Sequence, residues 1–196
     1  MLILKRVNAT GNLYWFYMTK LTQRIGLPRY EADEHYKLAL AAYQKNDYDQ
    51  AIDQITKAID LLPRQPEYHA ARGLFYLRDG ITDKAQEEFD EALRIFGFEM
   101  LAHYGLGVIA YKAKQWQEAR QHFTAALAAQ PERAETLYYM ALVQHRLRNN
   151  AEALSYMRQA AVLFEQANDR SRRSDANKWV KTFEDLVAKA TTSSQS

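Results

Sequence analysis

The chain has 196 residues, of which 26 are lysine or arginine and 24 are aspartate or glutamate, so its formal net charge is only +2. This balance gives no electrostatic basis for nucleic acid as the main partner, because binding to phosphates needs a clear excess of cations. The chain contains no cysteine, which excludes disulfides, thiolate metal sites and cysteine nucleophiles.

The first 31 residues are expected to form a segment of their own, basic and rich in aromatic side chains. An aromatic run at residues 14–17 is followed by Met18, Leu21 and Ile25. Three interpretations stay open: a helix that caps the first repeat, an anchor at a membrane surface or a partner, or a start of translation at Met18, which would leave residues 1–17 outside the native protein. The segment lacks the uninterrupted apolar centre of a secretion signal, so cytoplasmic residence is expected.

Small residues recur every 34 residues through the middle of the chain. Such a period indicates a repeat architecture, in which each unit buries its apolar face against its neighbours. The units are expected at 32–65, 66–99, 100–133 and 134–167. The small residues that mark them are Ala39, Gly73, Gly107 and Ala141, then Ala51, Ala85, Ala119 and Ala153, then Ala58, Ala92, Ala126 and Ala160.

Each unit contains two apolar stripes with helical spacing, separated by a polar break, which predicts a pair of helices. Two breaks carry a capping box, formed by Asp47 with Gln50 and by Asn149 with Glu152. In the second unit the break is the turn signal at residues 79–80. Terminators follow the second helix of the first three units, at Pro63, Gly97 and Pro131.

The small residues have a steric purpose. Two helices joined by a short turn must cross closely, so Gly73 is expected to face Ala85, and Gly107 to face Ala119. A large side chain at these crossings would push the helices apart. Large residues four positions after the marker alanines are expected to fill the remaining gaps, each contributing about 1.5–3 kcal/mol when buried; they are Ile55, Phe89, Phe123 and Met157.

The exposed flank of the last unit needs a cap. Residues 168–190 supply a helix that starts at Ser174 or Asp175. Glu165 stands where the other units have a terminator, so the second helix of the fourth unit is expected to run on towards Asn168. The polar tail at 191–196 is expected to be disordered. The apolar stripe of the capping helix is Trp179, Val180, Phe183, Leu186, Val187 and Ala190.

The phased pattern over residues 32–167 resembles the tetratricopeptide repeat family, whose units carry a small residue at position eight, alanine at twenty and twenty-seven, an aromatic at twenty-four and often proline at thirty-two. The resemblance implies an all-α fold, a right-handed α-solenoid of four helix pairs with a C-terminal capping helix. It also implies a concave groove lined by the first helix of each pair.

The resemblance further implies that positions two, five, nine, twelve and thirteen of each unit face this groove. These positions hold tyrosine and aliphatic side chains, which suit a peptide or helix of a partner protein. The alternative is that several of them pack sideways on the neighbouring first helix. The candidate partner-binding residues are Tyr36, Leu40, Tyr43, Leu74, Leu77, Arg78, Tyr104, Val108, Tyr111, Lys112, Tyr138, Leu142, His145 and Arg146.

Two charged rows accompany the groove. Position thirteen gives a basic row, Arg78, Lys112 and Arg146, and position two gives an acidic row whose members are Asp33, Glu67 and Glu135. Either the rows orient a ligand with charges of both signs, or they only complement the helix dipoles.

Some members of the family grip a C-terminal carboxylate with a set of lysine, asparagine and arginine residues. The corresponding places hold Tyr36, Leu40, Leu74, Leu101 and Gly105, so a ligand more apolar than an acidic tail is expected.

Three histidines also recur at a spacing of 34, namely His35, His69 and His103. Equivalent places on stacked units lie about 8–10 Å apart, so these three rings cannot share one ion at about 2.1 Å. No nucleophile–base set, phosphate loop or metal motif is present, and no cofactor is expected. The sequence therefore predicts a non-enzymatic scaffold for a protein partner; the alternative is a membrane-associated assembly factor held by the N-terminal segment.

Overall fold

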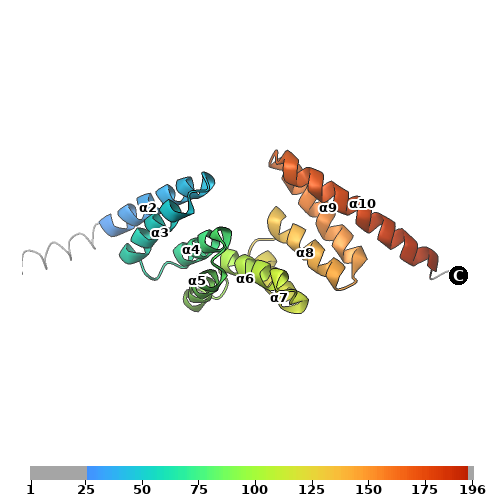
Figure 1. Cartoon of the computed structure of the whole chain (residues 1–196), viewed down its shortest axis with the longest axis horizontal. Helices are drawn as coiled ribbons and strands as arrows, with labels where there is room; N and C mark the ends of the chain where they lie inside the picture. The colour runs from blue at the N-terminus through green and yellow to red at the C-terminus, as the bar shows by residue number, and fades with distance from the viewer. Residues whose placement is uncertain (1–25, 194–196) are drawn as a thin grey trace, which may run out of the picture.

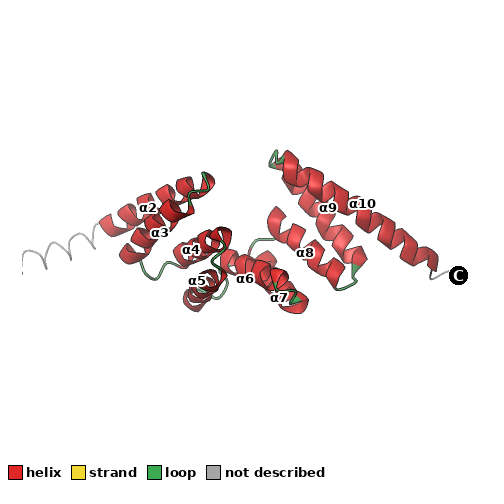
Figure 2. Ribbon diagram, in the orientation of Figure 1, coloured by secondary structure: helices red, strands yellow, loops and turns green. Residues whose placement is uncertain are grey.

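The computed structural model describes residues 26–193, and every regular element within that range is an α-helix (Figure 2). None of these helices combines the length and the apolar character that a bilayer crossing requires. The three interpretations of the N-terminal segment concern residues 1–25 and lie outside the described part. The helices are α2 (Leu27–Gln44), α3 (Tyr48–Leu61), α4 (Pro66–Asp79), α5 (Thr82–Ile95), α6 (Met100–Lys112), α7 (Trp116–Ala129), α8 (Ala134–Arg146), α9 (Asn150–Gln166) and α10 (Arg170–Ser193).

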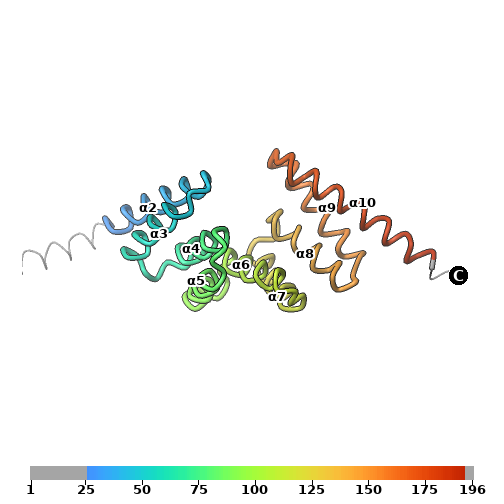
Figure 3. Tube along the Cα trace, viewed as in Figure 1, coloured from blue at the N-terminus to red at the C-terminus, as the bar shows by residue number. Residues whose placement is uncertain are grey.

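The helices pack as consecutive pairs that follow one another along an arc (Figures 1 and 3). Each pair packs on the next through its neighbouring helices, and α10 packs on α9. The first helices also pack on one another, α4 on α6 and α6 on α8, and so form the inner layer of the arc. This arrangement confirms the predicted all-α solenoid of helix pairs with a C-terminal cap.

The repeated small residues lie at the centre of each helix pair. Ala85 and Ala119 are fully buried, and the rings of Phe89 and Phe123 are buried beside them. A Cβ atom added to Gly73 would lie 2.7 Å from the Phe89 ring and 3.1 Å from the Ala85 carbonyl oxygen. The predicted close crossing is therefore present, but the phenylalanine ring is a nearer obstacle than the alanine.

Gly105 is tighter still, although the repeat pattern did not single it out. A Cβ atom there would lie 2.1 Å from the ring of Phe89, which belongs to the preceding unit. The glycine thus lets α6 pack closely on α5, and this contact joins the second helix pair to the third.

The two predicted capping boxes have different outcomes. The Asp47 carboxylate accepts the backbone N–H of Gln50 at 3.1 Å, so this half of the predicted box is confirmed, whereas the Asp47 N–H donates to the Ala42 carbonyl. Asn149 is the N-cap residue of α9 as predicted, but the side-chain hydrogen bond expected of it is wrong. Its side-chain amide instead donates to the side-chain oxygen of the buried Gln144 at 3.0 Å, because a buried amide needs a partner more than an exposed helix end does.

The turns between the two helices of each pair share one backbone conformation. A residue with positive φ recurs every 34 positions, and only the second unit uses glycine there. The φ angles are 60° at Asn46, 87° at Gly80, 62° at Lys114 and 68° at Arg148. Side chains with a Cβ pay a steric cost in this left-handed region.

Helix α2 begins before the first repeat was expected to begin. Pro28 lies in its first turn, where a ring-fixed φ suits helix initiation, and Gly26 precedes it with φ of 72°. Residues 27–31 therefore belong to the first helix of the array rather than to a separate segment.

The C-terminal part is more helical than the sequence predicted. Helix α9 runs to Gln166, as the missing terminator indicated. Helix α10 begins at Arg170, earlier than expected, because the Asp169 carboxylate accepts the Arg172 N–H at 2.9 Å. It continues through residues 191–193, where disorder was predicted, with the Thr191 hydroxyl donating to the Ala188 carbonyl at 2.7 Å.

Candidate partner-binding groove

The inner helices display most of the predicted groove residues but bury four of them. Leu77, Tyr104, Val108 and Leu142 are only 6%, 5%, 5% and 8% exposed. The prediction that they form an open contact surface is therefore wrong. Leu77, Tyr104 and Val108 belong to one core cluster of the middle units, whereas Leu142 packs with residues of α9 and α10 such as Met157 and Phe183.

The remaining predicted residues keep some exposure. Leu40, Arg78, Lys112 and Arg146 are exposed. Six others are half-buried, with part of each side chain packed against a neighbouring helix. These are Tyr36, Tyr43, Leu74, Tyr111, Tyr138 and His145.

An aromatic cluster occupies the middle of the inner layer, and Tyr139 is its centre. The Tyr139 ring stacks on Phe123 with centroids 5.7 Å apart. It meets Tyr104, Tyr111 and Tyr138 edge-on at 6.1, 5.6 and 5.9 Å. Edge-to-face pairs of this kind stabilise by about 0.5–1.5 kcal/mol beyond the buried area.

Sequence reasoning missed Tyr139, although a signal was present. Position six of the earlier units holds Lys37, Ala71 and Gly105, and only the fourth unit places an aromatic ring there. That departure from the repeat indicates a local feature of the fourth unit.

A cavity of about 230 Å³ opens beside this cluster. Helices α4, α6, α8, α9 and α10 all contribute to its wall, so residues about 100 positions apart in the chain meet there. Its wall combines aromatic rings with two cations and two anions. The lining residues are Arg78, Tyr104, Glu135, Tyr138, Tyr139, Phe164, Arg172 and Asp175.

The capping helix closes one end of the cavity through two polar contacts. The Arg172 guanidinium pairs with the Glu135 carboxylate, and the Tyr138 hydroxyl donates to the Asp175 carboxylate. Burial pushes the pKa of Glu135 upward, but its own backbone N–H and the nearby arginines hold that pKa below its usual value. Burial and the contact with Asp175 raise the pKa of Tyr138, so its hydroxyl stays protonated.

These two capping-helix residues could not be found from the repeat. Arg172 and Asp175 lie outside the 34-residue phase, which ends with the fourth unit, and the predicted apolar stripe of α10 says nothing about its polar face.

The three cations of the basic row lie on exposed residues. Within residues 26–193, none of its three cations has a carboxylate partner. The Arg78 Nε donates to the Tyr43 hydroxyl at 3.1 Å, and the Arg146 guanidinium lies over the Trp116 ring at 5.7 Å. Tyrosine and tryptophan orient these cations without neutralising them.

Two members of the acidic row, in contrast, are engaged within the protein. Asp33 accepts the Tyr68 hydroxyl at 2.8 Å, and Glu135 pairs with Arg172, whereas the exposed Glu67 accepts only the Gln65 amide at 3.5 Å. The two rows are thus unequal, and the groove presents unpaired positive charge.

The recurring histidines each reach the second helix of their own unit. His35 meets Gln54 at 2.9 Å, whereas His69 meets Glu88 at 2.9 Å. Hydrogen bonding to Glu88 raises the pKa of His69 above 6.5, and the Arg72 guanidinium also donates to Glu88 at 2.6 Å. Burial raises the pKa of Glu88, but these two hydrogen bonds outweigh it and hold the pKa below 4.5.

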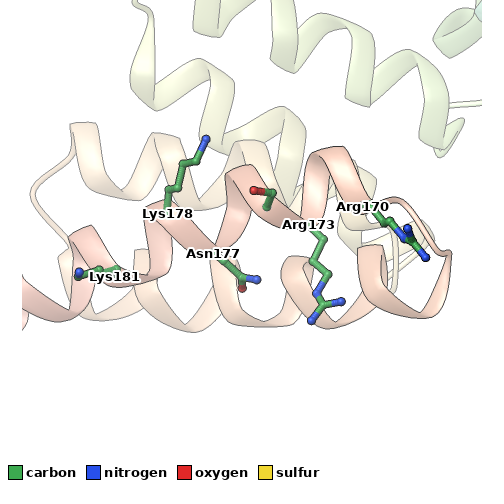
Figure 4. A pocket seen from close by; sticks show the side chains of 6 residues that line it. Arg170, Arg173, Asn177, Lys178 and Lys181 are labelled. Atoms are coloured by element: carbon green, nitrogen blue, oxygen red, sulfur yellow. The ribbon is translucent and has the colours of Figure 1, made fainter.

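A second surface feature lies on α10 and is shown in Figure 4. An open depression of about 460 Å³ runs along one face of that helix. Arg173 pairs there with Glu165 of α9 at 3.2 Å. The labelled side chains diverge from the helix rather than converge on one point, so this is a solvated basic face. It is lined by Arg170, Arg173, Ser174, Asn177, Lys178 and Lys181.

Comparisons with known proteins agree with this architecture. A tetratricopeptide repeat family model matches residues 36–99, 82–131 and 104–169. The type IV pilus assembly protein PilF of Pseudomonas aeruginosa is 25% identical over 133 residues, which are 67% of this chain and 53% of PilF. The human protein O-mannosyl-transferase TMTC1 is 28% identical over 118 residues, 58% of this chain and 13% of that protein. The chain therefore spans about half of the first relative and a small part of the second.

Two solved structures share the fold. The structure from a functional characterisation of Pseudomonas aeruginosa PilF has a TM-score of 0.62 at 20% identity, covering 80% of this chain and 78% of that one. The first repeat domain of Spaghetti (RPAP3), bound to the HSP90 peptide SRMEEVD, has a TM-score of 0.56 at 20% identity, covering 60% of this chain and 96% of that one.

Proposed function

We propose that this chain, which belongs to the tetratricopeptide repeat family, is a non-enzymatic scaffold that binds a peptide or helix of a partner protein along its inner helices. Repeats of this family are generally interaction modules rather than catalysts. The observation that carries the proposal is the cavity beside Tyr139, with its aromatic wall and the unpaired Arg78 at its edge.

The chemistry of the groove indicates what the partner segment presents. Half-buried rings such as Tyr138 and Tyr111 offer apolar area, which suits an aliphatic or aromatic side chain. Arg78 and Lys112 offer unneutralised positive charge along one edge. The preferred segment therefore combines apolar anchors with an acidic side chain, and charge on the chain as a whole gives no reason for nucleic acid to compete.

The central test combines two substitutions in the cavity. Tyr138→Ala with Arg78→Glu removes an anchor and reverses a charge, and neither residue is fully buried. Partner capture from a lysate, read by mass spectrometry, should lose its specific proteins in this variant. The matched control is Arg120→Glu. This exposed arginine lies on α7, the second helix of the third pair, away from the inner layer, so the variant should capture the same proteins as the wild type.

Two results would contradict the groove assignment. One is equal capture by the wild type and the double variant when circular dichroism shows both to be folded. The other is equal loss in the double variant and in Arg120→Glu, since that would indicate a general charge effect.

A second candidate function is a membrane-associated assembly factor for a protein complex. The relative PilF is named as a type IV pilus assembly protein, and residues 1–30 carry five basic side chains and no acidic one. Flotation with anionic liposomes separates the candidates. A chain that floats only when residues 1–17 are present supports the anchor, whereas failure of both versions to float supports the cytoplasmic scaffold.

A further inference from the structure

Two histidines of the third helix pair face each other, and no other described unit has such a pair. His103 of α6 and His122 of α7 place their Nδ1 atoms 3.3 Å apart, with ring centroids 5.6 Å apart. Both side chains are half-buried, so water reaches them.

The hydrogen bonding of His103 fixes where its lone pair lies. Its Nε2 contacts the Gly97 carbonyl oxygen at 3.1 Å. A carbonyl can only accept, so Nε2 carries the proton, and the Nδ1 of the neutral ring presents a lone pair towards His122. Histidines that bind metals commonly donate their other N–H to a backbone carbonyl in this way.

The spacing of the two nitrogens suits a shared ion. Bonds of about 2.0–2.1 Å from a tetrahedral ion to two imidazoles require nitrogens about 3.3–3.4 Å apart. The observed separation of 3.3 Å meets this requirement. Without an ion, the His122 Nδ1–H donates to the His103 Nδ1, and an ion would take the place of that proton once the His122 ring carries its hydrogen on Nε2. We propose that His103 and His122 form a two-histidine site for a divalent transition-metal ion of the zinc type.

The surroundings of His122 favour its neutral ring, which is the form that binds a metal. Burial and the neighbouring His103 lower the pKa of His122, whereas Glu118, one helical turn before it, and Asp90 of α5 act in the opposite direction. Within residues 26–193 no group of three metal-ligating side chains gathers, so the ion has two protein ligands and water completes its shell. An ion held in this way binds more weakly than one in a four-ligand structural site.

The equivalent places in the other units show why the site is confined to the third pair. The partner of His35 is Gln54, and the partner of His69 is Glu88. His69 donates from both ring nitrogens, to Glu88 and to the Pro63 carbonyl, and therefore has no lone pair for a metal. An ion at the third pair links α6 to α7. The hydrogen bond from His103 to the Gly97 carbonyl connects α6 to the turn that precedes it.

The chain itself supplies the variants for the test. His122→Gln reproduces the pairing of the first unit, where glutamine is compatible with the same helix crossing. His35→Gln is the matched control, because it removes a histidine at the same repeat position without touching the pair. Calorimetric titration of the full chain with zinc chloride, and separately with magnesium chloride, measures the affinities.

We expect the wild type to bind one zinc ion, to show no binding of magnesium, which prefers oxygen ligands, and to melt at a higher temperature with zinc present. His122→Gln should bind zinc at least tenfold more weakly, and His35→Gln should match the wild type. Resonances of His103 and His122 should shift first in an NMR titration. Zinc binding that is unchanged in His122→Gln, or equal shifts at all histidines, would overturn the proposal and indicate adventitious binding.

Discussion

The second and third helix pairs carry different side chains at a place where their backbones have the same arrangement. In both, a histidine of the first helix reaches the residue 19 positions later and donates from Nε2 to the carbonyl of the preceding turn. The second pair supplies Glu88 as the partner, whereas the third supplies His122. The comparison teaches that the recurring small residues fix how the two helices cross. The polar residue that meets the histidine can vary without changing that crossing.

The largest effect is expected where the two pairs are most tightly joined. Gly105→Ala should destabilise the protein by about 3 kcal/mol, because the new Cβ would lie 2.1 Å from the buried Phe89 ring. Urea unfolding followed by circular dichroism measures the change. Gly97→Ala is the control, since its Cβ would be 3.9 Å from the nearest atom and should cost little. Equal effects at both glycines would contradict the close contact.

The shared crossing geometry can be tested in both pairs at once. Ala85→Leu and Ala119→Leu should each destabilise by about 2 kcal/mol through overpacking, since both alanines are fully buried in equivalent places. Thermal melting of the two variants provides the measurement. An unchanged melting temperature in one variant alone would show that the two crossings are less alike than their sequences indicate.

The charged partner of the second pair should give a pH signature. The raised pKa of His69 means that its contribution is complete below pH 6.5 and is lost as the pH rises through the raised value. The lowered pKa of Glu88 means that its contribution is present above pH 4.5 and is lost as the pH falls through the lowered value. We expect His69→Gln to cost about 1 kcal/mol between these limits and less once the pH exceeds the raised pKa of His69.

Urea midpoints of wild type and His69→Gln, taken from pH 4 to pH 8, measure this window. His35→Gln is the matched comparison, because its partner Gln54 carries no charge. A constant difference across the whole pH range would mean that the His69–Glu88 contact contributes packing alone.

The smallest effect is expected at the turns. Lys114 adopts φ of 62° at the place where the second pair has Gly80. Lys114→Gly should stabilise the protein by about 0.5 kcal/mol, since the steric relief exceeds the extra freedom of the unfolded chain. The reverse change, Gly80→Lys, should destabilise by a similar amount, although nothing lies within 4 Å of a Cβ there. Differential scanning calorimetry resolves shifts of this size.

The groove shows how far sequence reasoning reached. Repeat positions located the inner helices correctly, and they identified exposed candidates such as Arg78 and Lys112. They also assigned Tyr104 and Val108 to an open surface, whereas both are buried. A repeat position states which way a side chain leaves its own helix, but it does not state how closely the next helix approaches.

The sequence by itself determined the helix pairs, their order and their crossings, because the alternation of small and large residues every 34 positions carries that information locally. Only the tertiary structure decided the cavity and the histidine pair. The cavity needs Arg172 and Asp175 from α10 beside Tyr139 of α8, and the pair needs His122 opposite His103. The cavity depends on the distance between helices of different pairs, which follows from the curvature of the whole array, and the histidine contact depends on how two side chains meet within one crossing.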